Sequence, residues 1–461
     1  MRNMARRPQL ETLEERSLLT AGALDTTFGG GAGFVKTDLG STADSARTIA
    51  VEPWDSKAVL ACDSSSSASG AVFTLVRYNT DGTLDTTFGQ GGVVRTDFYG
   101  GGDAVNQVIF TASHQIIAVG RAYNGQGKGA GQQIGIARYN ADGSLDTSFG
   151  SGGKVTVQAS TAYKSNSSNA SAAVVDSSGR LIVAGSYVGQ NPFKAFNYAN
   201  VLLRLNANGS LDTSFGSGGI LVGAIASSTY DTWANLQLKP VGSGYQIDAY
   251  GVDHGKDSLA QFNSNGTRDT SFGTNGEVVL AGGGIGGGGG TILIAFEPDG
   301  GFVGVNHQGN QSPISGLFCT FGLTRYDAAG NVVFDKTIDL SPLLPSGETW
   351  GETRIKGVAV DPSGRIVVAG DMLLKGTTPT TRWDSLLVRL DAAGNFDSTF
   401  GNGGLVSTDF GPYYDGFTCL AIQPDGSILA AGQIDDGNGA VDQNGNDIVQ
   451  YDVLVARYSS Q

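Results

Sequence analysis

From residue 24 onward, the chain is a succession of short apolar runs in which apolar and polar residues tend to alternate. Examples are VVRT at 93–96, GVAV at 357–360, IVVAG at 366–370 and LLVRL at 386–390, each followed directly by Asp. Short runs of period 2 between turn-forming residues predict β-strands. No segment of helix length separates these runs, so the pattern predicts an all-β protein.

The runs recur in a fixed order, with a period near sixty residues. Units aligned on an LDTSFG-type motif start at Leu24, Leu84, Leu145, Leu211, Arg268, Val332 and Phe396, with spacings of 60, 61, 66, 57, 64 and 64 residues. Six units carry a close copy of the motif, and the unit at Val332 does not. Each unit holds four short apolar runs, so the sequence predicts seven units of four strands.

Seven four-stranded units favour a closed ring. A four-stranded sheet cannot bury both of its faces alone, so neighbouring units must stack face to face. We therefore predict a seven-bladed β-propeller of four-stranded antiparallel blades over residues 23–461. A linear β-solenoid is the alternative, although its coils are usually shorter. Because the chain starts at a motif and ends in a fourth run, we expect the ring to close by side-chain packing between the first and last blades. Closure by a blade that mixes strands from both termini is the alternative.

The repeated motif itself is interpreted as a structural corner that links one blade to the next. Asp146 is expected to accept a hydrogen bond from the backbone N–H two residues further on. Phe149 is large enough to wedge between adjacent sheets, and the glycines that follow permit a turn in which side chains would clash. A ring of metal-binding aspartates is the functional alternative. Since the motif is lost near Val332, we expect irregular packing there.

Two stretches resemble known sequence families. RYNADGSLDTSFGSGG at 138–153, with VVDSSGRLIVAG at 174–185, resembles the delta-60 repeat of large bacterial proteins, and the resemblance extends over 24–461. It implies a propeller fold and no particular activity. LETLEERSLLTA at 10–21 is similar to the N-terminal LExLExRxLL motif of exported or surface proteins in planctomycete-type bacteria. That similarity implies an extracellular or cell-surface protein, with residues 1–22 as a targeting segment of amphipathic character.

Charge, hydropathy and cysteine content argue against nucleic-acid binding, a membrane span, and a disulfide framework or zinc site. The formal net charge of −14 argues against binding to DNA or RNA. The sequence contains no run of eighteen apolar residues, so it predicts no membrane-spanning helix. Cys62, Cys319 and Cys419 are too few and too scattered for a disulfide framework or a zinc site, so we expect buried free thiols. We expect a monomer.

Long irregular segments fall at one end of the predicted ring, at 121–133, 186–200, 371–384 and 433–447, whereas the other end carries nearly uniform turns. Insertions gathered on one face of a repeat protein often mark its binding face. Their aromatic side chains, with two from a loop between the first and second runs of a unit, suit a protein or glycan partner. These residues are Tyr123, Tyr187, Phe193, Phe196, Tyr198, Trp383, Tyr413 and Tyr414. Tolerated variation in solvent-exposed loops is the alternative.

One loop has the spacing of a calcium site. Asp442, Asn444 and Asn446 occupy positions 1, 3 and 5 of a Ca²⁺-binding loop, and Asp452 lies one residue before position 12. Position 6 is Asp447 where such loops have glycine. Calcium is the one cofactor that the sequence suggests, and an ordinary polar loop is the alternative.

Signals for catalysis are weaker. The three histidines fall in different units, and GxSxG and HExxH motifs are missing from the sequence. His254 and His307 occupy equivalent strand ends in consecutive units, so they are expected near one rim. The glycine-rich run at 281–290 precedes an expected strand, which argues against a phosphate-binding loop. We therefore expect a non-catalytic binding or structural propeller. A Ca²⁺-dependent hydrolase or lyase with its site at the channel mouth is the alternative.

Overall fold

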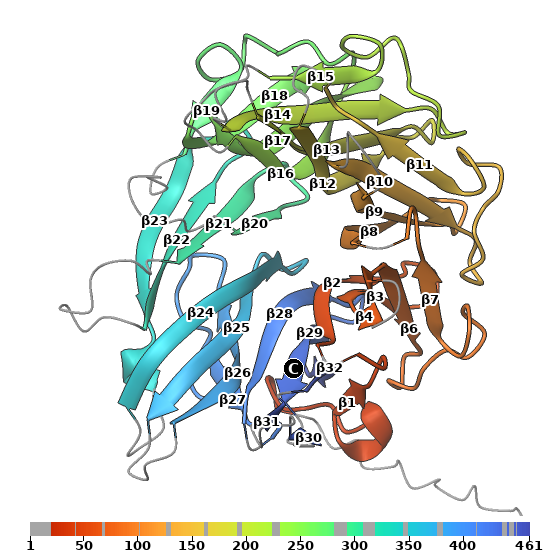
Figure 1. The fold of residues 1–461 in the computed structure, drawn as a ribbon. Helices are drawn as coiled ribbons and strands as arrows, with labels where there is room; N and C mark the ends of the chain where they lie inside the picture. Colours follow the sequence, from red (N-terminus) through yellow and green to blue (C-terminus); the bar gives the residue numbers. More distant parts are fainter. Residues whose placement is uncertain are drawn as a thin grey trace, which may run out of the picture.

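A computed structural model describes the chain over sixteen ranges. They are 20–41, 43–66, 70–100, 102–125, 131–160, 165–190, 196–223, 231–280, 293–307, 319–343, 349–375, 381–411, 413–435, 440–441, 447–448 and 450–461. Within them, seven four-stranded antiparallel sheets stand around a central axis (Figure 1). The prediction of a seven-bladed propeller with four-stranded blades is confirmed.

The blades follow one another along the chain. Blade 1 contains β2 (Ser45–Val51), β3 (Ala58–Asp63), β6 (Phe73–Tyr78) and β7 (Val93–Thr96). Blade 2 contains β8 (Ala104–Phe110), β9 (Ile116–Asn124), β10 (Gly131–Tyr139) and β11 (Lys154–Val157). Blade 3 contains β12 (Ser165–Val175), β13 (Leu181–Gln190), β14 (Phe196–Leu205) and β15 (Ile220–Val222). Blade 4 contains β16 (Thr232–Val241), β17 (Gly244–Asp253), β18 (Lys256–Asn263) and β19 (Glu277–Val279).

The remaining blades continue this order until the ring closes. Blade 5 contains β20 (Leu293–Phe296), β21 (Phe302–His307), β22 (Thr320–Tyr326) and β23 (Val332–Asp339). Blade 6 contains β24 (Thr349–Val360), β25 (Ile366–Lys375), β26 (Thr381–Leu390) and β27 (Leu405–Thr408). Blade 7 contains β28 (Asp415–Ile422), β29 (Ile428–Asp435), β32 (Tyr451–Tyr458) and β1 (Phe34–Thr37). The minor elements are β4 (Ser65–Ser66), β5 (Gly70–Ala71), β30 (Ala440–Val441), β31 (Asp447–Ile448) and the 3₁₀ turns η1 (Gly29–Gly31) and η2 (Ser341–Leu343).

The ring closes by hydrogen bonding between the two ends of the chain, which corrects the expectation of side-chain packing alone. Strand β1 near the N-terminus pairs with β32 near the C-terminus, with Phe34 opposite Ala456 and Thr37 opposite Val453. It thereby becomes the outermost strand of blade 7 (Figure 1). Sharing one blade between both ends of the chain removes two free sheet edges, which stabilises a closed ring.

This closure also sets where each blade begins. The innermost strands of neighbouring blades contact one another, and within each blade the chain runs outward from them. The strand that follows each glycine pair is therefore the outermost strand of the blade before it. The LDTSFG-type corner accordingly lies between the third and outermost strands of one blade, and not between two blades as we expected. The actual link between blades follows the outermost strand, as at 97–103.

Although it lies within a blade, the corner does fasten adjacent blades together. In blade 1 the guanidinium of Arg77 lies 2.8 Å from the Asp85 carboxylate and 4.5 Å from the Phe88 ring centroid. It also donates to the backbone oxygen of Ala141 in blade 2, where the N–H of Gly89 donates to Asp142. The same Arg–Asp–Phe arrangement recurs at Arg138–Asp146–Phe149, Arg204–Asp212–Phe215, Arg389–Asp397–Phe400 and Arg457–Asp25–Phe28. The repeated motif is thus explained as a structural contact between blades.

The glycine that ends each VAG-type run is explained by a bulge in the innermost strand. In blade 3 the register shifts between Ala170 and Ala172, opposite Gly185. A Cβ added to Gly185 would lie 1.9 Å from the backbone oxygen of Asn169, so no side chain fits there. Four other blades repeat this pairing of bulge and glycine, at Gly120, Gly251, Gly370 and Gly432.

Seven clusters of buried apolar residues fill the seven interfaces between blades. Each consists of side chains from facing sheets, and the corner phenylalanine Phe149 belongs to one of them, as predicted. Cys62 and Cys319 are buried free thiols, and Cys419 is a partly buried one. Blade 5 lacks the corner, and its outermost strand follows the third through a short turn. Its sheet still has four strands, and its register shifts between Arg325 and Tyr326, opposite the start of β23 at Val332. Within the described ranges, no helix has the length and apolar character needed to cross a membrane.

Candidate functional site

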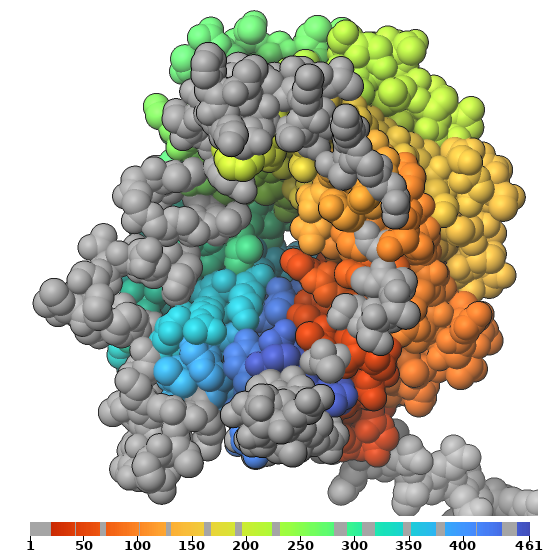
Figure 2. Space-filling model, viewed as in Figure 1, coloured from red at the N-terminus to blue at the C-terminus, as the bar shows by residue number. Residues whose placement is uncertain are grey.

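The two ends of the ring differ in what they carry. Loops between the second and third strands, together with the links between blades, lie at one end, here called the loop end. Turns between the first and second strands, together with the repeated corners, lie at the opposite corner end. This follows from the antiparallel order of every blade. The space-filling view shows a narrow opening at the centre of the ring (Figure 2).

The predicted aromatic residues of the loop end do not all reach solvent. Tyr123 and Tyr413 are exposed, at 39% and 56%. Phe196 is exposed as well, whereas Tyr198, Trp383 and Tyr414 are partly buried. Phe193 lies outside the described residues. Tyr187, which we expected at the surface, is fully buried between blades 2 and 3, because strand β13 continues through it to Gln190.

Blades 6 and 7 bring several of these side chains together in what we call the blade 6–7 cluster: Arg354, Trp383, Tyr414 and Tyr451. The Arg354 guanidinium stacks 3.8 Å above the Trp383 ring, and the Trp383 and Tyr414 ring centroids are 6.1 Å apart. Tyr451 meets Tyr414 edge to face at 5.9 Å. A cation stacked on an aromatic surface at the rim of a propeller is an arrangement suited to binding a partner.

A buried polar group on the two inner strands of blade 6 supports this cluster: Lys356 lies on β24 and Asp371 on β25. The Asp371 carboxylate is fully buried and accepts hydrogen bonds from Lys356 at 2.5 Å and from the Tyr414 hydroxyl at 2.6 Å. Lys356 also donates to the Tyr414 oxygen at 3.0 Å. Burial, together with the Asp371 carboxylate, raises the pKa of Tyr414 well above its usual value. The phenol therefore stays protonated, and the three groups hold Tyr414 in place.

Only part of the predicted calcium loop can be placed. Asp442, Asn444 and Asn446 lie outside the described residues, while Asp452 is buried on β32. Ring closure brings the Asp452 carboxylate together with those of Asp38 and Asp44, with oxygens of all three within 4.8 Å of one another. These three are residues that could hold a cation, and the calcium site stays a prediction.

The Asp44 carboxylate already has hydrogen-bond partners within the link between blades. It accepts hydrogen bonds from the Leu39 N–H at 2.8 Å and from the Ser41 hydroxyl at 2.5 Å. Asp103 and Asp415 occupy the corresponding position at the start of their innermost strands, and each accepts two backbone N–H groups. Aspartate at this position therefore fixes the link between blades.

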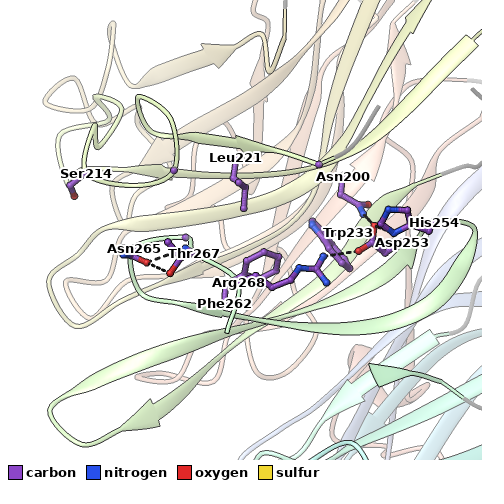
Figure 3. Close-up of a pocket in the computed structure, with 13 residues that line it drawn as sticks. Asn200, Ser214, Leu221, Trp233, Asp253, His254, Phe262, Asn265, Thr267 and Arg268 are labelled. Atoms are coloured by element: carbon purple, nitrogen blue, oxygen red, sulfur yellow. Dashed lines mark hydrogen bonds and ion pairs between the residues drawn. The ribbon is translucent and has the colours of Figure 1, made fainter. Parts of the chain in front are cut away.

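A second group of ionisable side chains lies between blades 3 and 4 (Figure 3). His254 Nδ1 is 3.2 Å from the buried Asp253 carboxylate, and Glu277 belongs to the outermost strand β19. The Arg268 guanidinium lies 2.7 Å from Asp253 and 3.4 Å from Glu277, so it occupies the space between the two carboxylates where a cation would bind. The His307 side chain lies outside the described residues, so its predicted proximity to His254 stays a prediction.

Asp253, His254 and Arg268 border a cavity of about 620 Å³ between blades 3 and 4. A second hollow of about 770 Å³ lies on the other side of His254 and Arg268. Sequence reasoning missed this cavity, and it also missed Arg354, Lys356 and Asp371. For the cavity one signal was available, since Arg268 stands where most of the other corners have leucine.

Comparison with known proteins supports the fold and leaves activity open. A family described as "Domain of unknown function (DUF5122) beta-propeller" matches residues 55–88, 115–149, 177–215 and 362–400, which lie in blades 1, 2, 3 and 6. The chain is therefore a β-propeller repeat protein. No curated protein sequence matches it.

Solved structures with a similar fold share little sequence with this chain. A glucose dehydrogenase is 15% identical, with a TM-score of 0.40 over 77% of this chain and 98% of that one. An α-L-arabinanase of Penicillium chrysogenum is 10% identical, with a TM-score of 0.39 over 95% and 96% of the two chains. Polysaccharide lyase Uly1 is 9% identical, with a TM-score of 0.42 over 90% of each chain. Similarity at this level carries no information about activity.

Proposed function

We propose that this protein is a non-catalytic binding propeller of the cell surface or extracellular space, and that its loop end docks a partner through the blade 6–7 cluster. The observation that carries the proposal is the stacking of Arg354 on Trp383 beside Tyr414. Tryptophan, tyrosine and arginine are the residues that contribute most to protein–protein affinity. A protein is therefore the favoured partner, and a glycan is the other class that such a surface accommodates.

The hydrogen bonds that fix Tyr414 and Asp371 favour a role in binding over a role in catalysis. Tyr414 is held by Lys356 and Asp371 and keeps its proton, so it is a hydrogen-bond donor and not a general base. Asp371 is neutralised by Lys356, which removes it as a free carboxylate. A rigid, preorganised aromatic surface loses little conformational entropy when a partner docks. These features suit a recognition surface better than the hydrolase or lyase alternative.

The extracellular or cell-surface location is part of the same proposal. It rests on the acidic composition and on the N-terminal LExLExRxLL similarity. Immunoblots of culture medium, surface-shaved cells and cytoplasm test it directly. Recovery confined to the cytoplasm would contradict it.

The binding proposal is tested by retention on immobilised protein. Envelope proteins and envelope polysaccharides of the source cells are passed in separate arms over the wild type, over Arg354→Ala/Trp383→Ala and over a control. The control is Asn79→Ala/Asn140→Ala, which alters exposed turns at the corner end. We expect a retained protein that the control still binds and that the cluster variant releases.

Retention in the polysaccharide arm alone, with the same dependence on Trp383, would assign a glycan as the partner and overturn the choice of a protein. Equal retention by the wild type and the cluster variant would overturn the cluster as the binding surface. Melting temperatures of all variants establish that each is folded before the comparison is made.

A further inference from the structure

The cavity between blades 3 and 4 exists where the repeat departs from its own pattern. At three other interfaces a tyrosine hydroxyl of one blade bonds a threonine hydroxyl of the preceding blade. These pairs are Tyr78–Thr37 at 2.7 Å, Tyr139–Thr96 at 2.8 Å and Tyr458–Thr408 at 2.8 Å. At the blade 3–4 interface the same two positions are Phe262 and Gly223, and both residues line the cavity.

A third departure lies beside them. The corner leucines, Leu84, Leu145 and Leu211, each pack into the apolar cluster shared with the preceding blade. Blade 4 has Arg268 at this position, and its guanidinium lies 5.2 Å from the Phe262 ring centroid and reaches Asp253. At those three interfaces an apolar corner side chain fills this position, whereas at the blade 3–4 interface the charged side chain of Arg268 occupies it.

The backbone does not require glycine at position 223. A Cβ at Gly223 would meet its nearest atom, Cβ of Asn200, at 3.5 Å, which is an ordinary van der Waals contact. At Gly185 the corresponding approach is 1.9 Å. The missing side chain at Gly223 therefore leaves open space without serving the local conformation, and that space belongs to the cavity.

The lining combines an apolar middle with polar groups at both ends. Leu221, Trp233 and Phe262 form the apolar part (Figure 3). One end carries Asn200, which is 4% exposed and donates from Nδ2 to Asp253 at 2.9 Å. Its Oδ1 atom is buried and accepts no hydrogen bond from the residues that the structure describes. A buried acceptor without a donor costs free energy that a bound donor would recover.

The other end carries hydroxyl and amide groups from the turn of blade 4 and the corner of blade 3. Thr267 and Ser214 supply the hydroxyls, and Asn265 supplies the amide. Arg268 balances Asp253, the carboxylate that lines the cavity, so this ion pair leaves no net charge to attract an ionic ligand. A ligand that fits must be neutral and must both donate and accept along an apolar wall.

We infer that this cavity binds a neutral saccharide of one or two rings. Sugar hydroxyls can donate to Asn200 Oδ1 and can accept from the Asn265 side-chain amide at the opposite end, where the Thr267 and Ser214 hydroxyls already donate to Asn265 and Asp212 and offer only their oxygens. Ring C–H groups pack on the apolar wall. A cavity of about 620 Å³ has the size of an ordinary small-molecule site. The site is separate from the blade 6–7 cluster and does not depend on the function proposed for it.

Calorimetric titration with a panel of neutral sugars tests this inference. The panel contains glucose, galactose, mannose, xylose and N-acetylglucosamine, and for each of them the β-linked disaccharide of two units of that sugar. The main variant is Gly223→Thr/Phe262→Tyr, which restores the tyrosine–threonine pair of the other interfaces and fills the cavity while keeping a packed interface. We expect saturable binding to the wild type, and binding at least about tenfold weaker for this variant and for Asn200→Ala.

Asn79→Ala/Asn140→Ala is the matched control, because it alters exposed turns at the corner end and leaves both the cavity and the blade 6–7 cluster intact. It should bind the sugar as the wild type does. Because the cavity lining includes no residue of the cluster, failure of this inference is distinguishable from failure of the proposed function. The inference is overturned if no panel member binds the wild type saturably. It is also overturned if a sugar binds the wild type and the cavity-filling variant equally.

Discussion

The guanidinium of Arg457 lies 2.8 Å from the carboxylate of Asp25, although the two residues are 432 positions apart in the chain. Arg457 also stacks over Phe28 and donates to the backbone oxygen of Thr80 in blade 1. The contact that fastens successive blades elsewhere is thus reproduced across the point where the ring closes. The first residues of the propeller supply half of a contact that the last strand completes.

Replacing Arg457 with leucine should therefore weaken the closure itself. We expect a loss of about 2–4 kcal/mol in the free energy of unfolding, because the substitution leaves Asp25 without its ion-pair partner. Arg138→Leu removes the same set of contacts within the chain and serves as the control. Amide hydrogen exchange in β1 should accelerate in Arg457→Leu only. Equal exchange of β1 in both variants would contradict the role assigned to Arg457.

The bulge-facing glycines should tolerate no side chain. Gly185→Ala places a Cβ 1.9 Å from a backbone oxygen, so we expect a loss of more than about 2 kcal/mol or failure to fold. Gly223→Ala is the contrasting variant, because its backbone conformation and surroundings admit a methyl group. It should be neutral or stabilising by up to about 1 kcal/mol. Denaturant unfolding of the two variants measures the difference, and similar losses in both would refute this explanation of the repeated bulge.

Stability should fall with rising pH through the titration of Glu52. Burial raises the pKa of Glu52 to about 7, and the effect of burial exceeds the opposing effect of Arg77. Between the usual glutamate pKa and about 7, the folded state keeps a proton that the unfolded state releases, so the stabilisation is lost as pH rises. In Glu52→Gln this loss is absent. Melting temperatures from about pH 5 to about pH 8 should shift steadily in favour of the variant; a constant gap between the two proteins would contradict the assignment.

The sequence was sufficient for the number of blades and for the structural reading of the corner, because both depend on a period that is visible in one chain. It was not sufficient to show which of the four runs in each unit forms the innermost strand of a blade. Any of the four runs is acceptable as the innermost strand until the pairing of β1 with β32 is known. The expected link between blades was therefore misplaced, although Asp146 and Phe149 make the contacts predicted for them.

The candidate sites depend on contacts between blades and were harder to predict. Asp371 and Tyr414 are 43 positions apart and meet only because blades 6 and 7 stack. Tyr187 was assigned to a loop because its strand continues beyond the apolar run that marks it. Arg268, in contrast, was visible as a departure from the repeat, and what it signals became clear only with Gly223 and Phe262 beside it.

Hydrogen–deuterium exchange of the protein alone and with its retained partner tests the central claim most directly, because it locates the bound surface without substitutions. The account predicts slower exchange at the loop end of blades 6 and 7, in segments 349–356, 381–385 and 413–416. Protection confined to the corner segments 85–92, 146–153 and 397–404 would contradict it.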